Sequence, residues 1–165
     1  LTIGREMRLS AKELDELVLL AVLHDIGKVG IKESVLQKTE PLTAEDWEEM
    51  KKHPEIGCRI AQNTPELAPV AEYILCHHER WDGQGYPQGL KGEEIPLLCR
   101  ILAVADAYDA MTSDRPYRKA MSREEAIAEI KRNAGTQFEP EIVEFFLEGI
   151  KKITEIKGDE ENGIY

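Results

Sequence analysis

The sequence predicts an all-α protein built as one domain. Apolar residues recur at helical spacing through most of the chain, and several of these segments begin with a serine or threonine capping residue. No segment alternates between apolar and polar residues as a half-buried strand does. The 165 residues are enough to bury a core without disulfide bonds or a structural metal. We therefore expect a helical bundle.

The first expected helix follows Ser10, which forms a capping box with Glu13. Its apolar stripe begins at Leu14 and continues to His24 and Asp25, so these two polar residues are expected on or beside the core-facing side. Six further helices bring the total to about seven. They are expected to begin at Thr43, at the His53-Pro54 junction, at Pro65, at about Leu97, after Ser122 and at Pro140.

A Gly-rich loop is expected between the fourth and fifth of these helices. Residues 80–96 hold four glycines and two prolines and show no sustained period. Loops of this length in compact domains are commonly functional, and we expect this one to be ordered. The expected organisation is one domain over residues 1–156, followed by a flexible C-terminal tail over residues 157–165.

The amino-acid composition limits the binding partners and the cellular location that we expect for the protein. Acidic residues outnumber basic ones by 32 to 21, which gives a net charge of -11, so long nucleic acids are unsuitable partners. A small anion remains compatible where metal ions or arginines reverse the local charge. No apolar run has the roughly 18 residues of a membrane span, and the three cysteines are odd in number and widely spaced. We expect a cytoplasmic protein with reduced thiols and no membrane contact.

The four histidines are the first candidates for chemistry. His24, His53, His77 and His78 all lie at expected helix ends or on inward faces. A single histidine in such a place is more often a core or capping residue than a ligand. Here two of them are adjacent, and His24 is followed by Asp25. A buried carboxylate among imidazoles is costly unless a cation compensates it, and two divalent ions bridged by Asp25 would do so.

Three motifs in the chain resemble those of the HD-GYP family. Residues 24–28 read HDIGK, residues 77–87 read HHERWDGQGYP, and residues 106–118 read DAYDAMTSDRPYR. The first is similar to the HD signature of the HD hydrolase superfamily, and the other two are similar to the HHE-GYP segment and the block that follows it. The likeness extends from about Leu9 to Ile150 and implies an HD-domain helical bundle with a long GYP loop.

The resemblance implies a bacterial signal-transduction enzyme, a metal-dependent phosphodiesterase that hydrolyses cyclic di-GMP to linear pGpG, GMP or both. It implies two divalent metals that hold a bridging hydroxide as the nucleophile. Their ligands are matched at the first metal by His24, Asp25 and Asp106, and at the second by His53, His77 and His78, with Asp25 as the bridge. Imidazole and carboxylate without thiolate suit iron or manganese, and zinc and nickel also accept such ligands.

Four more residues are assigned through the same motifs. Lys28 is expected to take part in catalysis beside Asp25 and to hold a phosphate oxygen, although a lysine here also suits a helix C-terminus. Arg115 and Arg118 are expected to bind the second phosphate, whereas without the motif they would be an exposed loop pair. Tyr86 is expected to stack on a guanine or to pack the loop, and Trp81 is interpreted as a packing residue.

The chain departs from the family at one point. Members carry a further histidine on a helix upstream of the HD pair, and no histidine precedes His24 here. We therefore expect the chain to lack the first helices of the domain, to bind the first metal weakly, and to expose an apolar face that favours a homodimer. The family pattern also implies a receiver or sensor domain upstream and a diguanylate cyclase (GGDEF) partner.

Two other functions fit parts of the pattern. An HD-superfamily enzyme acting on a nucleotide monoester or triphosphate shares the HD pair but does not need His77, His78 or the GYP loop. A non-catalytic module that binds cyclic di-GMP or a protein would tolerate the loss of one metal site. Metal analysis combined with a hydrolysis assay separates these alternatives.

Overall fold

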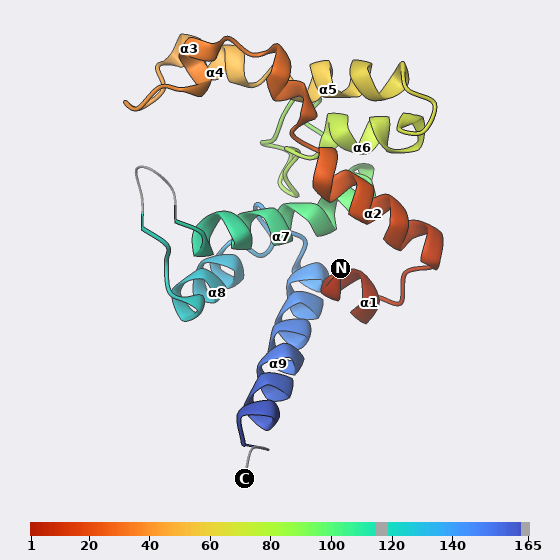
Figure 1. Ribbon diagram of the computed structural model, residues 1–165, viewed down its shortest axis with the longest axis vertical. Helices are drawn as coiled ribbons and strands as arrows, with labels where there is room; N and C mark the ends of the chain where they lie inside the picture. The colour runs from red at the N-terminus through yellow and green to blue at the C-terminus, as the bar shows by residue number, and fades with distance from the viewer. Residues whose placement is uncertain (115–118, 163–165) are drawn as a thin grey trace.

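Figure 1 shows the computed structural model, which describes residues 1–114 and 119–162, with residues 154–162 described as backbone only. Regular structure in this part is helical, apart from one isolated β-bridge between Ala134 and Phe138. The all-α prediction is therefore confirmed.

Within the described residues the chain forms nine α-helices and three short 3-10 helices. The α-helices are α1 (Thr2–Glu6), α2 (Ala11–Leu23), α3 (Glu33–Leu36), α4 (Ala44–Met50), α5 (His53–Gln62), α6 (Ala71–Cys76), α7 (Leu97–Thr112), α8 (Arg123–Arg132) and α9 (Pro140–Asn162). The 3-10 helices are η1 (Ile26–Gly30), η2 (Ala68–Val70) and η3 (Gly92–Glu94). All seven expected helices are present, as α2 and α4 to α9.

The helix caps expected from the sequence are formed. In each, the cap side chain accepts a hydrogen bond from a backbone N–H three residues later, and the acidic side chain at that position accepts one from the cap's backbone N–H. The pairs are Ser10 with Glu13, Thr43 with Asp46, and Ser122 with Glu125. Local sequence alone therefore sets the starts of α2, α4 and α8.

The structure has two short α-helices, α1 and α3, that the sequence did not predict. Helices of four or five residues are unstable alone, because nucleation costs more than so few hydrogen bonds return. Tertiary packing stabilises them here: α1 buries Ile3 and Gly4 and contacts α9, and α3 buries Val35 and contacts α4. Helix α1 thus depends on a segment at the other end of the chain, and α3 depends on the next helix along it.

Three boundaries also differ from those expected. The first helix ends at Leu23, and Asp25 begins the 3-10 turn η1 instead of continuing the α-helical stripe. The fourth expected helix starts as η2 at Ala68, after Pro65, and becomes α6 at Ala71. Helix α9 continues to Asn162, past the predicted start of the tail; the division between domain and tail stays a prediction.

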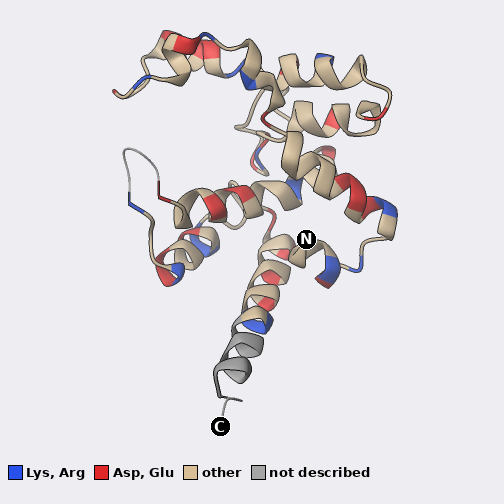
Figure 2. Cartoon of the chain, in the orientation of Figure 1, with Lys and Arg blue, Asp and Glu red and all other residues tan. Residues whose placement is uncertain are grey.

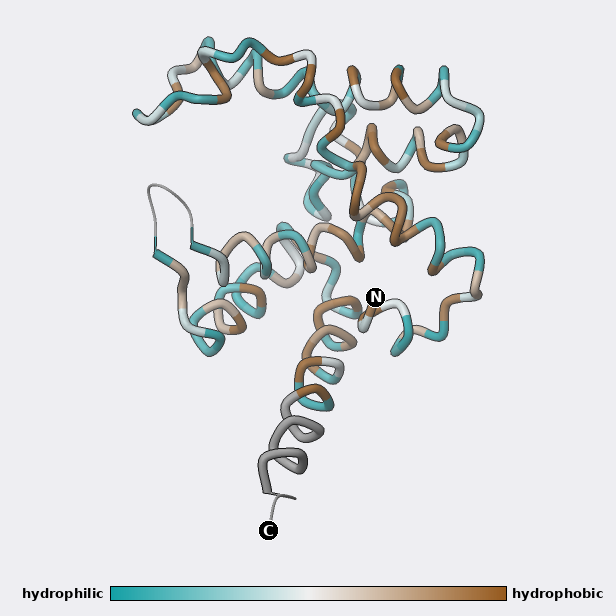
Figure 3. Tube along the Cα trace, viewed as in Figure 1, coloured by the Kyte–Doolittle hydropathy of each residue, from teal (hydrophilic) through white to brown (hydrophobic). Residues whose placement is uncertain are grey.

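The core is arranged around α7, which contacts α2, α6, α8 and α9. Its residues Leu98, Ile101, Leu102 and Val104 are at most 5% exposed. Figure 3 shows hydrophobic residues concentrated on α2 and on the part of α9 nearest α7. Since Asp106 follows this buried stripe on the same helix, the packing of α7 determines where that carboxylate stands.

A very close backbone contact joins η1 to α5. A Cβ added at Gly27 would lie 1.9 Å from the His53 backbone oxygen and 2.5 Å from the Gly57 nitrogen. Only glycine allows the two backbones to approach so closely. This contact fixes Asp25, two residues before Gly27, against the start of α5.

The distribution of charged residues over the helices agrees with the acidic composition. In Figure 2 acidic residues are spread over several helices, among them α2, α4, α7 and α9, with basic residues between them. The three cysteines Cys58, Cys76 and Cys99 are free and buried, as expected. No helix among the described residues is long and apolar enough to cross a membrane.

Candidate metal centre

Four of the predicted metal ligands meet where η1, α5 and α6 come together. Asp25 precedes η1, His53 is the first residue of α5, and His77 and His78 directly follow α6. Each of these four side chains places a ligand atom within 4.8 Å of the others. His53 and His77 are buried, at 1% and 5% exposure.

Backbone carbonyl groups orient three of the four imidazoles in the protein. A carbonyl oxygen only accepts hydrogen bonds, so the ring nitrogen facing it carries the hydrogen, and in a neutral ring the other nitrogen keeps a free lone pair. The Nδ1 atom lies 2.9 Å from Ala21 O in His24, 2.8 Å from Met50 O in His53 and 2.6 Å from Ile74 O in His77. These Nε2 atoms are thereby prepared as metal ligands.

The Nε2 atoms converge. That of His53 lies 3.2 Å from Nε2 of His77 and 3.1 Å from Nε2 of His78. Two lone pairs at this distance repel each other, and a cation among them turns the repulsion into coordination. The donor set of imidazole nitrogens and one carboxylate fits a divalent transition metal.

Protons do not compete strongly for these nitrogens. Burial is the main cause that lowers the pKa of His53, of His77 to about 4 and of His78 to about 2, and neighbouring histidines add to the effect. All three rings are therefore neutral at pH 7, which is the form that binds metal.

The metal-free protein is expected to lose stability as the pH falls from 7 to 5. In the unfolded chain His53, His77 and His78 take up protons near the ordinary pKa of about 6.5, whereas in the folded protein burial lowers the pKa of His53, of His77 to about 4 and of His78 to about 2. The unfolded state then binds more protons, so the free energy of unfolding falls by up to about 1.4 kcal/mol per pH unit for each histidine.

Urea midpoints of metal-free protein at pH 7, 6 and 5 measure this effect. The strongly shifted carboxylate of Asp46 contributes little in this range: its pKa is lowered to about 2 by its hydrogen bond to Lys38, and its contribution is lost only below about pH 4. A midpoint that is the same at pH 7 and pH 5 would contradict neutral histidines in the folded state.

Asp25 stands between two groups of donors. Its Oδ1 lies 3.3 Å from Nε2 of His53, and its Oδ2 lies 3.5 Å from Nε2 of His24. His24 Nε2 in turn lies 3.8 Å from Oδ1 of Asp106. The two oxygens of one carboxylate thus face the two predicted metal positions, which is the geometry a bridging ligand needs.

Lys28 reaches the same carboxylate. Its Nζ lies 2.6 Å from Oδ2 of Asp25, across one 3-10 turn. Burial alone would raise the pKa of Asp25, but the hydrogen bond and charge of Lys28, together with His24 and His53, bring it below its usual value. Asp25 is therefore ionised at neutral pH, with a cation already beside the oxygen that faces His24.

The Gly-rich loop lies against the histidines. The ring of Tyr86 stacks on the imidazole of His78, with centroids 4.8 Å apart and planes at 27°. Trp81 packs against Arg100, whose guanidinium carbon lies 5.8 Å from the ring centroid, and the Trp81 backbone N–H donates to the Gln137 carbonyl oxygen. The packing interpretation of Trp81 thus agrees with the structure, and Tyr86 contacts a predicted metal ligand.

Two of the predicted site residues fall in a segment that the structure does not describe. Arg115 and Arg118, assigned to phosphate, lie outside the described residues, and their role stays a prediction.

Glu79 was not assigned a role from the sequence, yet its side chain is buried, at 4% exposure, beside the histidine pair. Its place in the sequence, directly after the adjacent histidines and directly before the Gly-rich loop, is the signal that could have identified it as a residue of the site.

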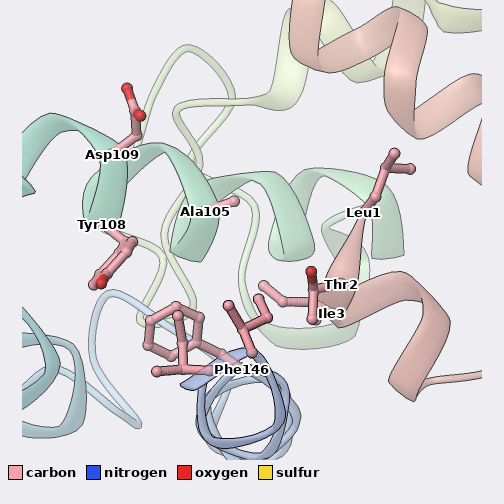
Figure 4. A pocket seen from close by; sticks show the side chains of 9 residues that line it. Leu1, Thr2, Ile3, Ala105, Tyr108, Asp109 and Phe146 are labelled. Atoms are coloured by element: carbon pink, nitrogen blue, oxygen red, sulfur yellow. The ribbon is translucent and has the colours of Figure 1, made fainter. Parts of the chain in front are cut away.

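A separate cavity of about 340 Å³ lies between α1, α7 and α9 (Figure 4). Its lining is mainly apolar and includes Leu1, Ile3 and Phe146, while the Asp109 carboxylate on α7 points away from the space between α7 and α9. The cavity brings no cluster of metal ligands together, so the chemistry is assigned to the histidine site.

Comparisons with known proteins show the family to which the chain belongs. The family model described as "HD domain" matches residues 1–142. A cyclic di-GMP phosphodiesterase of Thermotoga maritima is 49% identical over 156 residues, which cover 93% of this chain and 42% of that protein. The cyclic di-GMP phosphodiesterase response regulator RpfG of Xanthomonas campestris is 40% identical over 158 residues, which cover 94% of this chain and 42% of that protein.

The fold is also found in a solved structure. The crystal structure of a cyclic GMP-AMP specific phosphodiesterase of V. cholerae, V-cGAP3, superposes with a TM-score of 0.72 at 27% identity, covering 91% of this chain and 41% of that one. The chain therefore spans less than half the length of the relatives it matches.

Proposed function

The chain belongs to the HD domain family, and its motifs match the HD-GYP branch; on this basis we propose that it is the catalytic part of a metal-dependent phosphodiesterase that hydrolyses cyclic di-GMP. One observation carries the proposal: histidine Nε2 atoms converge on the carboxylate of Asp25, whose two oxygens face two groups of donors. The names of two relatives support cyclic di-GMP as the substrate.

The residues have distinct roles in this proposal. Two divalent metals, iron or manganese, would neutralise phosphate oxygens and activate water. In this proposal His24, Asp25 and Asp106 would hold one metal, and His53, His77 and His78 would hold the other together with Asp25. The products are linear pGpG, GMP or both. The parent protein is proposed to be a cytoplasmic signalling protein with a receiver or sensor domain and a GGDEF partner.

Lys28 is proposed to bind substrate. Its ammonium lies beside Asp25, at the exposed side of the site, with 41% of its side chain accessible. A phosphodiester that enters from this side brings a non-bridging oxygen within reach of that ammonium. Lys28 then stabilises negative charge that increases in the transition state.

The decisive assay loads the protein with Mn²⁺ or Fe²⁺ and follows cyclic di-GMP by chromatography. We expect linear pGpG or GMP to appear, and no product with the His53→Ala variant under the same conditions. Cyclic GMP-AMP, pGpG and nucleoside triphosphates serve as parallel substrates, since the solved relative is specific for cyclic GMP-AMP. Turnover of a triphosphate but of no cyclic dinucleotide would favour the other HD enzymes, and binding without turnover would favour a non-catalytic module.

Two metal equivalents are expected to bind with different affinities. Four ligands converge on the second position, whereas the first retains His24, Asp25 and Asp106, and Lys28 contacts the Asp25 oxygen on that side. In a Mn²⁺ titration we expect one tight step and one weak step. His53→Ala should remove the tight step, and Asp106→Ala only the weak one. Two equivalents of equal affinity would contradict this order.

Replacing Arg115 and Arg118 together by alanine is expected to weaken binding of cyclic di-GMP without changing metal content. These residues are assigned to phosphate, and each charge-assisted contact contributes about 1.5 to 3 kcal/mol. Calorimetry with cyclic di-GMP and elemental analysis of the same sample measure both quantities. Unchanged affinity in the double variant would show that the two arginines do not bind the ligand.

A further inference from the structure

Glu79 has an unusual environment for a carboxylate. It is 4% exposed, and its hydrogen-bond partners are backbone N–H groups of the Gly-rich loop. Oε1 accepts from Gln88 at 2.7 Å and from Gly89 at 3.1 Å, and Oε2 accepts from Leu90 at 3.1 Å. Burial of a carboxylate is costly, and three hydrogen bonds from backbone N–H groups compensate it. Glu79 therefore connects the end of α6 to the far side of the loop.

The near side of the loop lies on the backbone around Glu79. The Tyr86 N–H donates to the His78 carbonyl oxygen at 3.2 Å. A Cβ added at Gly85 would lie 2.4 Å from the Arg80 nitrogen and 2.5 Å from the Cα of Glu79. The chain at Gly85 and Tyr86 is thus held directly against the turn that carries the histidines.

His78 differs from the other three histidines in how its ring is held. The Nδ1 atoms of His24, His53 and His77 are hydrogen bonded to carbonyl oxygens three residues earlier, and no such bond is formed by His78 within the described residues. Its imidazole is stacked on Tyr86 on the side of the loop and packs against the rings of His77 and His53, at centroid distances of 4.0 and 4.9 Å, on the side of the site. The orientation of this ligand therefore depends on where the loop places Tyr86.

We propose that Glu79 is a positioning residue: by binding the loop at residues 88–90 it holds Tyr86 on His78 and so sets the affinity of the second metal position. This rests on the proposed metal-dependent function. It gives the GYP loop a role beyond contact with substrate, because the loop orients a metal ligand. Glu79 itself binds neither metal nor substrate.

The test is Glu79→Gln, which keeps the size of the side chain but replaces one acceptor oxygen by an amide that donates. We expect the affinity for the second metal to fall by about 10- to 100-fold, as for other changes around metal ligands. A chelator competition with Mn²⁺ gives the affinity, and Co²⁺ absorption reports the loss of a nitrogen ligand. Glu94→Gln is the matched control, since exposed Glu94 also accepts a backbone N–H at 3.0 Å from Lys91.

Two readouts do not need metal. Stacking on Tyr86 shifts the His78 ring resonances through the ring current, so Glu79→Gln should move these NMR signals in metal-free protein while those of His24 stay in place. In a Trp47→Phe background, the fluorescence of Trp81 reports whether the loop has left its position. Unchanged His78 resonances together with unchanged Mn²⁺ affinity would overturn the proposal, whether or not the protein hydrolyses cyclic di-GMP.

A second variant covers the case in which Glu79→Gln does not fold. Tyr86→Leu leaves the three hydrogen bonds of Glu79 in place but removes the ring from His78. We expect it to lower Mn²⁺ affinity by a similar factor, and we expect Tyr86→Phe to restore it. Wild-type affinity in Tyr86→Leu would show that the loop does not position His78. Where both single variants fold, the double variant should lose little more than either one, because both act through one contact.

Discussion

Asp25→Ala is expected to abolish the proposed hydrolysis of cyclic di-GMP and to lower the affinity of both metal positions. The two oxygens of Asp25 face His53 on one side and His24 on the other, so each metal would lose a ligand and a negative charge. Changes of residues around metal ligands cost about 10- to 100-fold in affinity, and removal of a bridging ligand should cost more. Elemental analysis and the cyclic di-GMP assay on one preparation measure both effects.

Asp15→Ala is the control for this variant, because Asp15 is an exposed carboxylate on α2 and its loss changes the net charge by the same amount. Circular dichroism should show that both variants are folded. The loss of Asp25 also frees Lys28 from its ion pair, so Asp25→Ala combined with Lys28→Ala tests whether the lysine alone causes the defect. Full metal occupancy in Asp25→Ala would rule out a bridging role.

Gly27→Ala is expected to destabilise the protein by more than about 3 kcal/mol and to disrupt the second metal position. The added Cβ would lie 1.9 Å from the His53 backbone oxygen and 2.5 Å from the Gly57 nitrogen. Both neighbours are backbone atoms, so no side-chain rotation relieves the overlap. The turn η1 and helix α5 must separate, which moves Asp25 away from His53.

Gly30→Ala in the same 3-10 turn separates this effect from a general intolerance of alanine. The atoms nearest to its Cβ would be side-chain carbons of Ile56, two of them at 3.0 and 3.1 Å, and a small rotation of that side chain makes room. Urea unfolding of the two variants gives the difference in stability, and a Mn²⁺ titration gives the difference in affinity. Equal stability of Gly27→Ala and wild type would contradict the close contact between η1 and α5.

Several features were determined by the sequence alone because they depend on near neighbours. The capping boxes of α2, α4 and α8 need only residues three positions apart, and all three formed as expected. The helical class follows from apolar spacing within each segment. The candidate ligands were also readable, because the His-Asp and His-His pairs are adjacent in the chain and the motifs around them are specific.

Other features were decided only by the tertiary structure, because they depend on residues distant in sequence. The helix expected to continue to Asp25 ends at Leu23, and the 3-10 turn η1 follows, in which Gly27 meets the backbone of His53, 26 positions later. Helix α1 exists because α9, at the other end of the chain, packs on it. The buried carboxylate of Glu79 acquires its role only when the loop returns to it. Hydrophobic periodicity indicates which face of a segment is buried, but it does not indicate which other segment packs against that face. The geometry of the metal ligands depends on that second piece of information, because it is set by how closely the backbones of η1 and α5 approach each other.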